Sequence, residues 1–131
     1  MQPDELLEVG DRTRLVARLE PRLPAHLEAS AILRLAESQG GFATVLAKGE
    51  RDAGTILLVT LCRGTGAVLF ERMPQLDGTR LFIATKLEIS ENKQEFSEYL
   101  ARRRAQDHDM WLIEVDIADP ERFVAQVNDS R

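Results

Sequence analysis

The sequence contains little of what several classes of protein need. Cys62 is the single cysteine among 131 residues, so the chain forms no internal disulfide and shows no secreted disulfide framework. Aromatic residues make up only 5% of the chain, which leaves few rings on which nucleic-acid bases could stack. The net charge of −5 also disfavours nonspecific binding to phosphate backbones. We therefore expect no nucleic-acid partner.

Long hydrophobic runs are missing as well. No segment approaches the roughly 20 apolar residues that a membrane helix needs. Residues 1–8 are acidic where a secretory signal is basic, and no apolar segment follows them. The sequence therefore predicts a cytoplasmic protein with no membrane association. The 44% of hydrophobic and 30% of charged residues are typical of one globular domain of this length.

The chain divides into a short extension and a domain. In residues 1–21 a weak apolar pattern is interrupted by Gly10 and stopped by Pro21, which indicates a marginal helix near residues 11–19 or partial disorder. We expect residues 22–131 to form a single α+β domain. Its first helix begins at Pro24, carries apolar residues at helical spacing, and ends at Gly40-Gly41.

Strands follow this helix, because the apolar pattern changes to alternation. The expected strands are residues 42–47, 55–62, 67–71 and 81–85, and residues 55–62 are apolar on both faces. The glycine-containing turns between them are too short for a parallel crossover. We expect residues 42–62 to form two adjoining strands covered by the first helix.

The pattern changes again at Asn92, which with Glu95 has the spacing of a capping box at a helix start. A fifth strand is expected at residues 110–115 and a final helix at Pro120. The predicted fold is α+β, in the order α-β-β-β-β-α-β-α. Its sheet is antiparallel, mostly a meander of about five strands, with the helices packed on one face.

Three segments also resemble a known family. Residues 22–26 (Arg-Leu-Pro-Ala-His) lead into residues 31–34, residues 49–54 read Gly-Glu-Arg-Asp-Ala-Gly, and residues 109–115 read Asp-Met-Trp-Leu-Ile-Glu-Val. From about Arg22 to Asp116 the chain resembles the bacterial family catalogued as domain of unknown function 1491, known mainly from alphaproteobacteria. The resemblance implies a small intracellular protein. It implies no activity, because the family has none assigned.

The densest group of candidate functional residues lies in the turn at residues 48–55. Two glycines bracket Glu50, Arg51 and Asp52, and the backbone N–H groups of such a turn can cradle an anion. On one interpretation these three side chains project from the sheet toward a ligand or partner. On the other, the segment is a solvated hairpin loop whose glycines relieve backbone strain.

The fifth strand offers further candidates. Glu114 and Asp116 share one face of it, and if that face meets Asp52, three carboxylates could hold a divalent cation or divide acid and base roles. The alternative is a half-exposed edge strand whose charges discourage aggregation. Trp111, on the other face, is either an interface residue or part of the core.

Other patterns carry less chemistry. Three consecutive residues, Asp107-His108-Asp109, rarely converge on one ion, and no second cluster of metal ligands supports them. Cys62 has no histidine near it in the sequence and lies in an apolar strand. We therefore predict no catalytic residue, no metal site and no cofactor.

These observations favour a non-catalytic binding or assembly module. Its partner is a second copy, bound through a sheet face or edge, or another protein. The binding residues proposed from the sequence are Glu50, Arg51, Asp52, Trp111 and Glu114.

Two other hypotheses remain open. One is a small carboxylate- or metal-dependent hydrolase that uses Glu50, Asp52 and Glu114. The other is a nucleic-acid contact through Arg34, Arg63 and residues 102–104, which the acidic balance disfavours.

Overall fold

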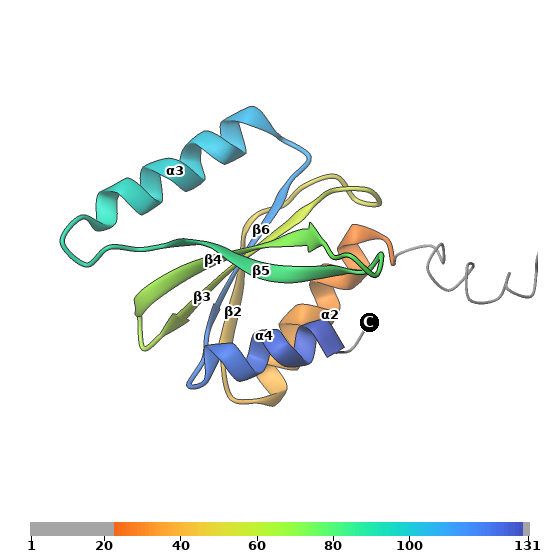
Figure 1. The fold of residues 1–131 in the computed structure, drawn as a ribbon, viewed down its shortest axis with the longest axis horizontal. Helices are drawn as coiled ribbons and strands as arrows, with labels where there is room; N and C mark the ends of the chain where they lie inside the picture. Colours follow the sequence, from red (N-terminus) through yellow and green to blue (C-terminus); the bar gives the residue numbers. More distant parts are fainter. Residues whose placement is uncertain (1–22, 130–131) are drawn as a thin grey trace, which may run out of the picture.

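A computed structural model describes residues 23–129 (Figure 1). The elements follow one another in the predicted order: α2 (Ala25–Ser38), β2 (Phe42–Ala47), β3 (Ile56–Cys62), β4 (Thr65–Pro74), β5 (Arg80–Leu87), α3 (Lys93–Gln106), β6 (Trp111–Asp116) and α4 (Pro120–Asp129). The marginal helix expected near residues 11–19 lies outside the described residues. The division into an extension, 1–21, and a domain, 22–131, stays a prediction.

The helices begin where the sequence predicts. Pro24 immediately precedes α2, and Pro120 is the first residue of α4. At α3, the Asn92 side chain accepts a hydrogen bond from the Glu95 backbone N–H over 3.3 Å. Glu95 does not complete the predicted capping box, because its carboxylate pairs with Lys86 instead, at 2.8 Å.

The sheet has the predicted five strands but not the predicted meander. Its order is β2-β6-β3-β4-β5, and β6 is antiparallel to β2 but parallel to β3, so the sheet is mixed. The prediction that residues 42–62 form two adjoining strands is wrong, because β6 separates β2 from β3. The eight residues 48–55 are not a hairpin turn. They cross the start of β6, a distance of about 10 Å or two strand spacings.

The last strand, β6, is therefore central, and its interpretation as a charged edge strand is wrong. Its side chains alternate as expected, with Trp111, Ile113 and Val115 buried on one face and Leu112 buried on the other. Both faces of β6 are covered by packed cores, so only Glu114 and Asp116 are partly exposed.

The helices lie on both faces of the sheet, so the prediction of helices on one face is wrong. Figure 1 shows α2 and α4 on one side and α3 on the other. The reason is visible in β3, where Ile56 and Leu58 pack in one core while Leu57 and Val59 pack in a second core with Phe96 of α3. A strand that is apolar on both faces needs cover on both.

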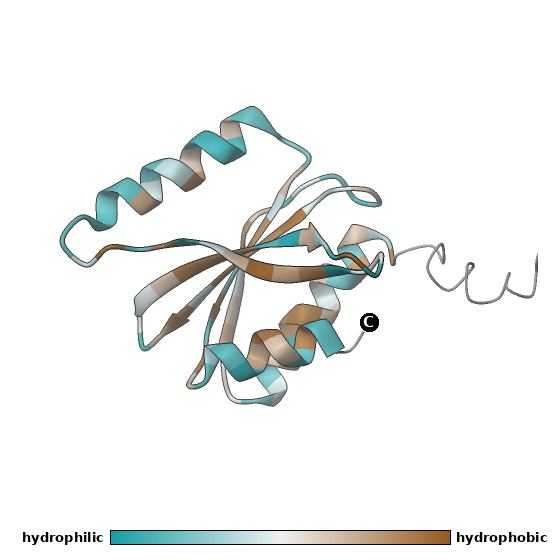
Figure 2. Cartoon of the chain, in the orientation of Figure 1, coloured by the Kyte–Doolittle hydropathy of each residue, from teal (hydrophilic) through white to brown (hydrophobic). Residues whose placement is uncertain are grey.

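Helix α3 covers its face only in part. Phe96 is its one buried residue, and Figure 2 shows the rest of the helix as mostly hydrophilic. Two ion pairs hold it toward β4 and β5: Glu95 with Lys86, and Arg103 with Glu71 at 3.0 Å. The part of this face formed by β6 and β2 is correspondingly less covered.

Candidate functional site

The charged turn uses its own glutamate to fix its shape. One Glu50 carboxylate oxygen accepts hydrogen bonds from the backbone N–H groups of Asp52 and Ala53, at 3.0 and 2.5 Å. The carboxylate therefore satisfies backbone donors inside the turn instead of pointing away from it. This accounts for a carboxylate at this position without a ligand.

The same turn supports the start of α2. The Arg51 carbonyl accepts from the His26 N–H at 2.8 Å, and the Asp52 carbonyl accepts from the Ala25 N–H at 3.0 Å. The first N–H groups of a helix normally lack partners and attract anions. Here the turn already satisfies two of them, so this helix start is not an open anion site.

Two glycines and a tryptophan lock the turn against β6. A Cβ atom on Gly49 or Gly54 would lie 2.1 or 2.3 Å from the Asp109 carbonyl oxygen, so only glycine fits at either position. The Trp111 indole N–H donates to the Glu50 carbonyl at 2.7 Å, and Trp111 is only 4% exposed. Trp111 thus joins the turn to the core.

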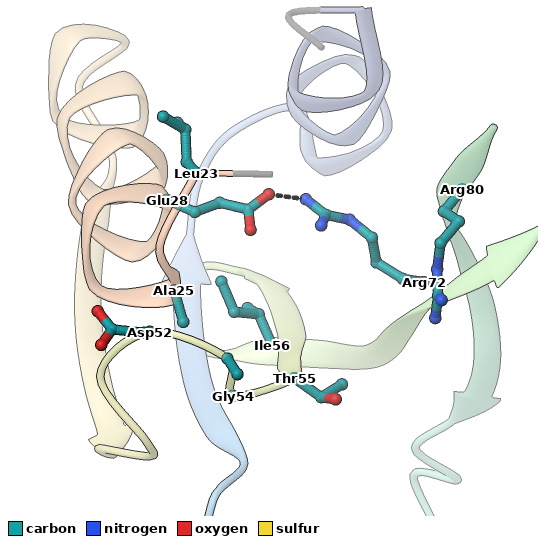
Figure 3. A pocket seen from close by; sticks show the side chains of 10 residues that line it. Leu23, Ala25, Glu28, Asp52, Gly54, Thr55, Ile56, Arg72 and Arg80 are labelled. Carbon is teal, nitrogen blue, oxygen red and sulfur yellow. Dashed lines mark hydrogen bonds and ion pairs between the residues drawn. The ribbon is translucent and has the colours of Figure 1, made fainter. Parts of the chain in front are cut away.

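A pocket of about 270 Å³ lies beside this turn, between the start of α2 and strands β4 and β5 (Figure 3). Arg72 crosses it to form an ion pair with Glu28, and its guanidinium carbon lies 4.5 Å from the centre of the Phe82 ring. Asp52 lies at the rim. The Arg72 guanidinium is paired with Glu28 and packs on the Phe82 ring. The charges in the pocket are therefore paired, and no strong field of one sign results.

The structure does not bring the predicted carboxylates together. Asp52 lines the pocket beside α2, whereas Glu114 lines a separate groove beneath α3. Among residues 23–129 no group of three His, Cys, Asp or Glu side chains is placed to hold a metal ion. Asp116 has a local partner, since its carboxylate accepts from the N–H groups of Arg63 and Gly64 at 2.8 Å each. It therefore stabilises the turn between β3 and β4.

The groove beneath α3 has a volume of about 390 Å³. Its floor consists of residues from β2, β6, β3 and β4, and its wall is one side of α3. Most of these side chains are apolar, with Arg104 and Glu88 among the charged exceptions. The principal lining residues are Leu46, Leu61, Phe96, Leu100, Leu112 and Glu114.

Through Leu46 the groove includes β2, which is one of the two sheet edges. Phe42 is 79% exposed and Leu46 39% exposed, and β2 contains no charged residue. The opposite edge, β5, is covered at Phe82. The Asn128 side chain accepts from the Phe82 N–H at 2.9 Å and donates to the Phe82 carbonyl at 3.2 Å.

The direction of the outer backbone groups of β2 follows from the ladders. The N–H groups of Trp111 and Ile117 donate to the carbonyls of Thr55 and Leu61. The backbone N–H and C=O groups of odd-numbered β6 residues are therefore directed toward β3. The backbone groups of even-numbered β6 residues are then directed toward β2, where Thr44 lies opposite Glu114. Because strand residues alternate, Ala43 and Val45 direct their N–H and C=O groups outward.

Sequence reasoning missed this edge. The alternation of residues 42–47 predicted the strand, yet nothing in that pattern distinguishes an edge strand from a central one. The informative signal was the contrast between a charge-free β2 and the charged residues Glu114 and Asp116 of β6, and it was interpreted the other way round.

Comparison with known proteins identifies the family. Residues 23–125 match the model of the family described as "Protein of unknown function (DUF1491)". The chain belongs to the DUF1491 family. The resemblance of the three short segments is thus confirmed, and the match includes the turn, β2 and β6. None of the curated proteins matches the chain.

Solved structures of DUF1491 proteins show the same fold. A crystal structure of a family member from Caulobacter crescentus CB15 has 29% sequence identity and a TM-score of 0.65, covering 78% of this chain and 94% of that one. An NMR structure of a DUF1491 protein from the same organism has 30% identity and a TM-score of 0.65, covering 78% and 92%. Protein Atu0922 from A. tumefaciens has 28% identity and a TM-score of 0.62, covering 75% and 88%.

Proposed function

We propose that this DUF1491 protein is a small non-catalytic binding or assembly module of the bacterial cytoplasm, which binds a protein partner by adding a strand to the outer edge of β2. The observation that carries this proposal is the difference between the two sheet edges. Asn128 occupies the outer backbone groups of β5 at Phe82, whereas the outer groups of Ala43 and Val45 form no hydrogen bond with any described residue.

Charge supports the same assignment. Proteins usually protect an exposed edge strand with charged residues, proline or a covering segment. β5 contains Arg80 and Lys86, while β2 reads Phe-Ala-Thr-Val-Leu-Ala. An edge of this composition is suited to strand addition, in which backbone hydrogen bonds give affinity and alternate side chains give specificity.

The groove beneath α3 provides the places for those side chains. One face of an added strand would continue the floor on which Leu46 and Glu114 lie. Of the residues proposed from the sequence, Glu114 belongs to this surface. A binding role for Glu50, Arg51, Asp52 and Trp111 stays a prediction, and the contacts of Glu50 and Trp111 within the fold explain their presence without one.

The carboxylate hydrolase lacks a comparable observation. It requires Asp52 and Glu114 within reach of one ion, and these residues line different cavities.

No helix among residues 23–129 is long and apolar enough to cross a membrane.

Photo-crosslinking in living bacteria tests the proposal. A photoreactive phenylalanine analogue at Phe42 should give a discrete protein adduct. The same analogue at Leu76, which is even more exposed but lies between β4 and β5, should give none. Val45→Pro should abolish the Phe42 adduct, because it removes an outward N–H without affecting the ladder to β6. No adduct at Phe42, or one that Val45→Pro leaves intact, would contradict strand addition.

A further inference from the structure

We infer that the strand added to β2 is β2 of a second copy. The two strands run antiparallel about a two-fold axis at Thr44, so that two five-stranded sheets join into one. This inference rests on the proposed function and names its partner. It is argued from the hydrogen-bond register, the side-chain pairs and the charges at the ends of β2.

The backbone register at Thr44 satisfies the outer groups of both strands. With Thr44 opposite Thr44 of the second copy, Ala43 lies opposite Val45 of the second copy, and Val45 opposite its Ala43. These are the residues whose N–H and C=O groups point outward. Each such pair exchanges two hydrogen bonds, as in an antiparallel ladder, so that the edge is fully used.

The neighbouring symmetric registers fit less well. An axis at Ala43 would place Gly41 opposite Val45, but the Gly41 N–H already donates to the Ala36 carbonyl at 2.9 Å. An axis at Val45 would place Ala43 opposite Ala47, beyond the irregularity that interrupts the ladder between Val45 and Ala47. Only the register at Thr44 keeps its hydrogen-bonded pairs, Ala43 with Val45, within the regular part of the strand.

The side chains are also complementary in this register. On the face that carries the groove, Phe42 of each copy lies opposite Leu46 of the other, and the two Thr44 side chains meet at the axis. On the opposite face, Ala43 lies opposite Val45, a small residue against a larger one. Aromatic–aliphatic and Thr–Thr cross-strand pairs of this kind stabilise antiparallel sheets. The pairing covers Phe42 and Leu46, two of the exposed apolar residues of the chain.

Charges beyond the ends of β2 are complementary as well. Because the strands are antiparallel, Lys48, which follows β2 in one copy, would lie near the C-terminal end of α2, which precedes β2 in the other. That end carries Glu37 and contains no basic residue in its last turn. A helix C-terminus attracts cations, and the two-fold axis repeats the contact. A foreign strand would have to supply these features itself, whereas a second copy contains them.

Two measurements test the inference. Sedimentation equilibrium of the purified full chain should give a mass near 29.4 kDa, twice the 14.7 kDa of one chain, and Val45→Pro should return it to 14.7 kDa with an unchanged circular dichroism spectrum. In a Cys62→Ser background, Thr44→Cys should form an intermolecular disulfide under mild oxidation. The paired Cα atoms would lie about 4.5 Å apart, within disulfide range.

Phe42→Cys in the same background is the matched control. Both positions are exposed, but in this register the two copies of residue 42 lie four residues apart along the strands, about 13 Å. This variant should form at least tenfold less disulfide dimer. Preferential cross-linking of Phe42→Cys would overturn the register.

A chain that stays monomeric at all concentrations, with no Thr44→Cys disulfide, would overturn the inference. That outcome is distinct from failure of the proposed function. If the photo-adduct at Phe42 persists with a mass other than twice the chain, strand addition stands and the partner is another protein. If the chain is dimeric but Val45→Pro leaves it so, the dimer interface lies elsewhere and the β2–β2 inference is overturned, while the Phe42 adduct still decides strand addition.

Discussion

At the scale of single residues, the turn between β2 and β3 is defined by where a side chain cannot fit. Gly54 packs against the Asp109 carbonyl, and the space that a Cβ would need is occupied by backbone. Backbone atoms cannot move aside as the end of a flexible side chain can. The position therefore needs glycine for space, and no positive φ angle is involved.

Gly54→Ala should therefore reduce stability more than the same substitution at a glycine whose only special feature is a positive φ angle. We expect Gly54→Ala to lower the free energy of unfolding by about 3 kcal/mol, because the clash forces the turn away from β6. Gly64 has φ +77° but open space around its Cα, so Gly64→Ala should cost about 1 kcal/mol. Urea unfolding followed by the fluorescence of Trp111 measures both. Equal losses would show that the turn moves easily.

The same turn shows what the sequence reveals and what it conceals. The prediction of a hairpin turn here is wrong, because β6 lies between β2 and β3, whereas Trp111 fits the predicted alternative of a core residue. The use of Glu50 was not predictable, because its partners are backbone N–H groups of its own turn. A free carboxylate and one that caps a turn look identical in a sequence. Only the direction of the side chain distinguishes them.

At the scale of elements, α3 is attached to the sheet by the buried Phe96 and by ion pairs to β4 and β5. Arg103 donates to the Glu71 carboxylate at 3.0 Å, and Thr85 donates to its other oxygen at 2.6 Å. Partial burial raises the pKa of Glu71, but these two hydrogen bonds and the Arg103 charge outweigh it and lower the pKa below its ordinary 4.5. The hydrogen bond to Glu71 in turn raises the pKa of Arg103.

The lowered pKa predicts how acid affects this attachment. Because the folded pKa of Glu71 is depressed, its contribution is complete above pH 4.5 and is lost as the pH falls through the folded value. Wild type should exceed Glu71→Gln in stability at neutral pH by about 0.5–1 kcal/mol, a value discounted for solvent exposure, and this advantage should vanish in acid. Thermal unfolding at several pH values measures it.

The control for this prediction is the same substitution in an Arg103→Met background. The Thr85 hydrogen bond remains there while the main cation is gone, so the pH-dependent advantage should shrink. An advantage that is constant with pH, or unaffected by Arg103→Met, would mean that the ion pair does not hold α3.

The helices and strands were easier to predict than the order of the strands in the sheet. Local signals such as Pro24, Asn92 and Pro120 mark helix starts directly, and those predictions are confirmed. Strand order depends on contacts between residues far apart in the sequence. The insertion of β6 between β2 and β3 relies on the close approach of residues 49–54 to Asp109, which no local pattern reports.

At the scale of the whole molecule, shape and charge together favour association at β2. The chain has a net charge of −5, so two copies repel at long range and can pair only where the acidic charge is low. β2 contains no charge, and Lys48 immediately follows it. The proposed dimer brings this lysine to the C-terminal end of α2 in the other copy. Lys48 should therefore aid pairing through its position and not only through its sign.

Comparison of two charge reversals separates these effects. Lys48→Glu and Lys93→Glu lower the net charge equally, but Lys93 lies at the start of α3, away from β2. At low salt Lys48→Glu should weaken dimerisation about fivefold more than Lys93→Glu, since two exposed contacts of about 0.5 kcal/mol each are lost. The difference should disappear near 1 M salt, where the Debye length falls to about 3 Å and exposed charges are screened from one another. Sedimentation equilibrium measures both dissociation constants, and equal weakening would mean that Lys48 lies outside the interface.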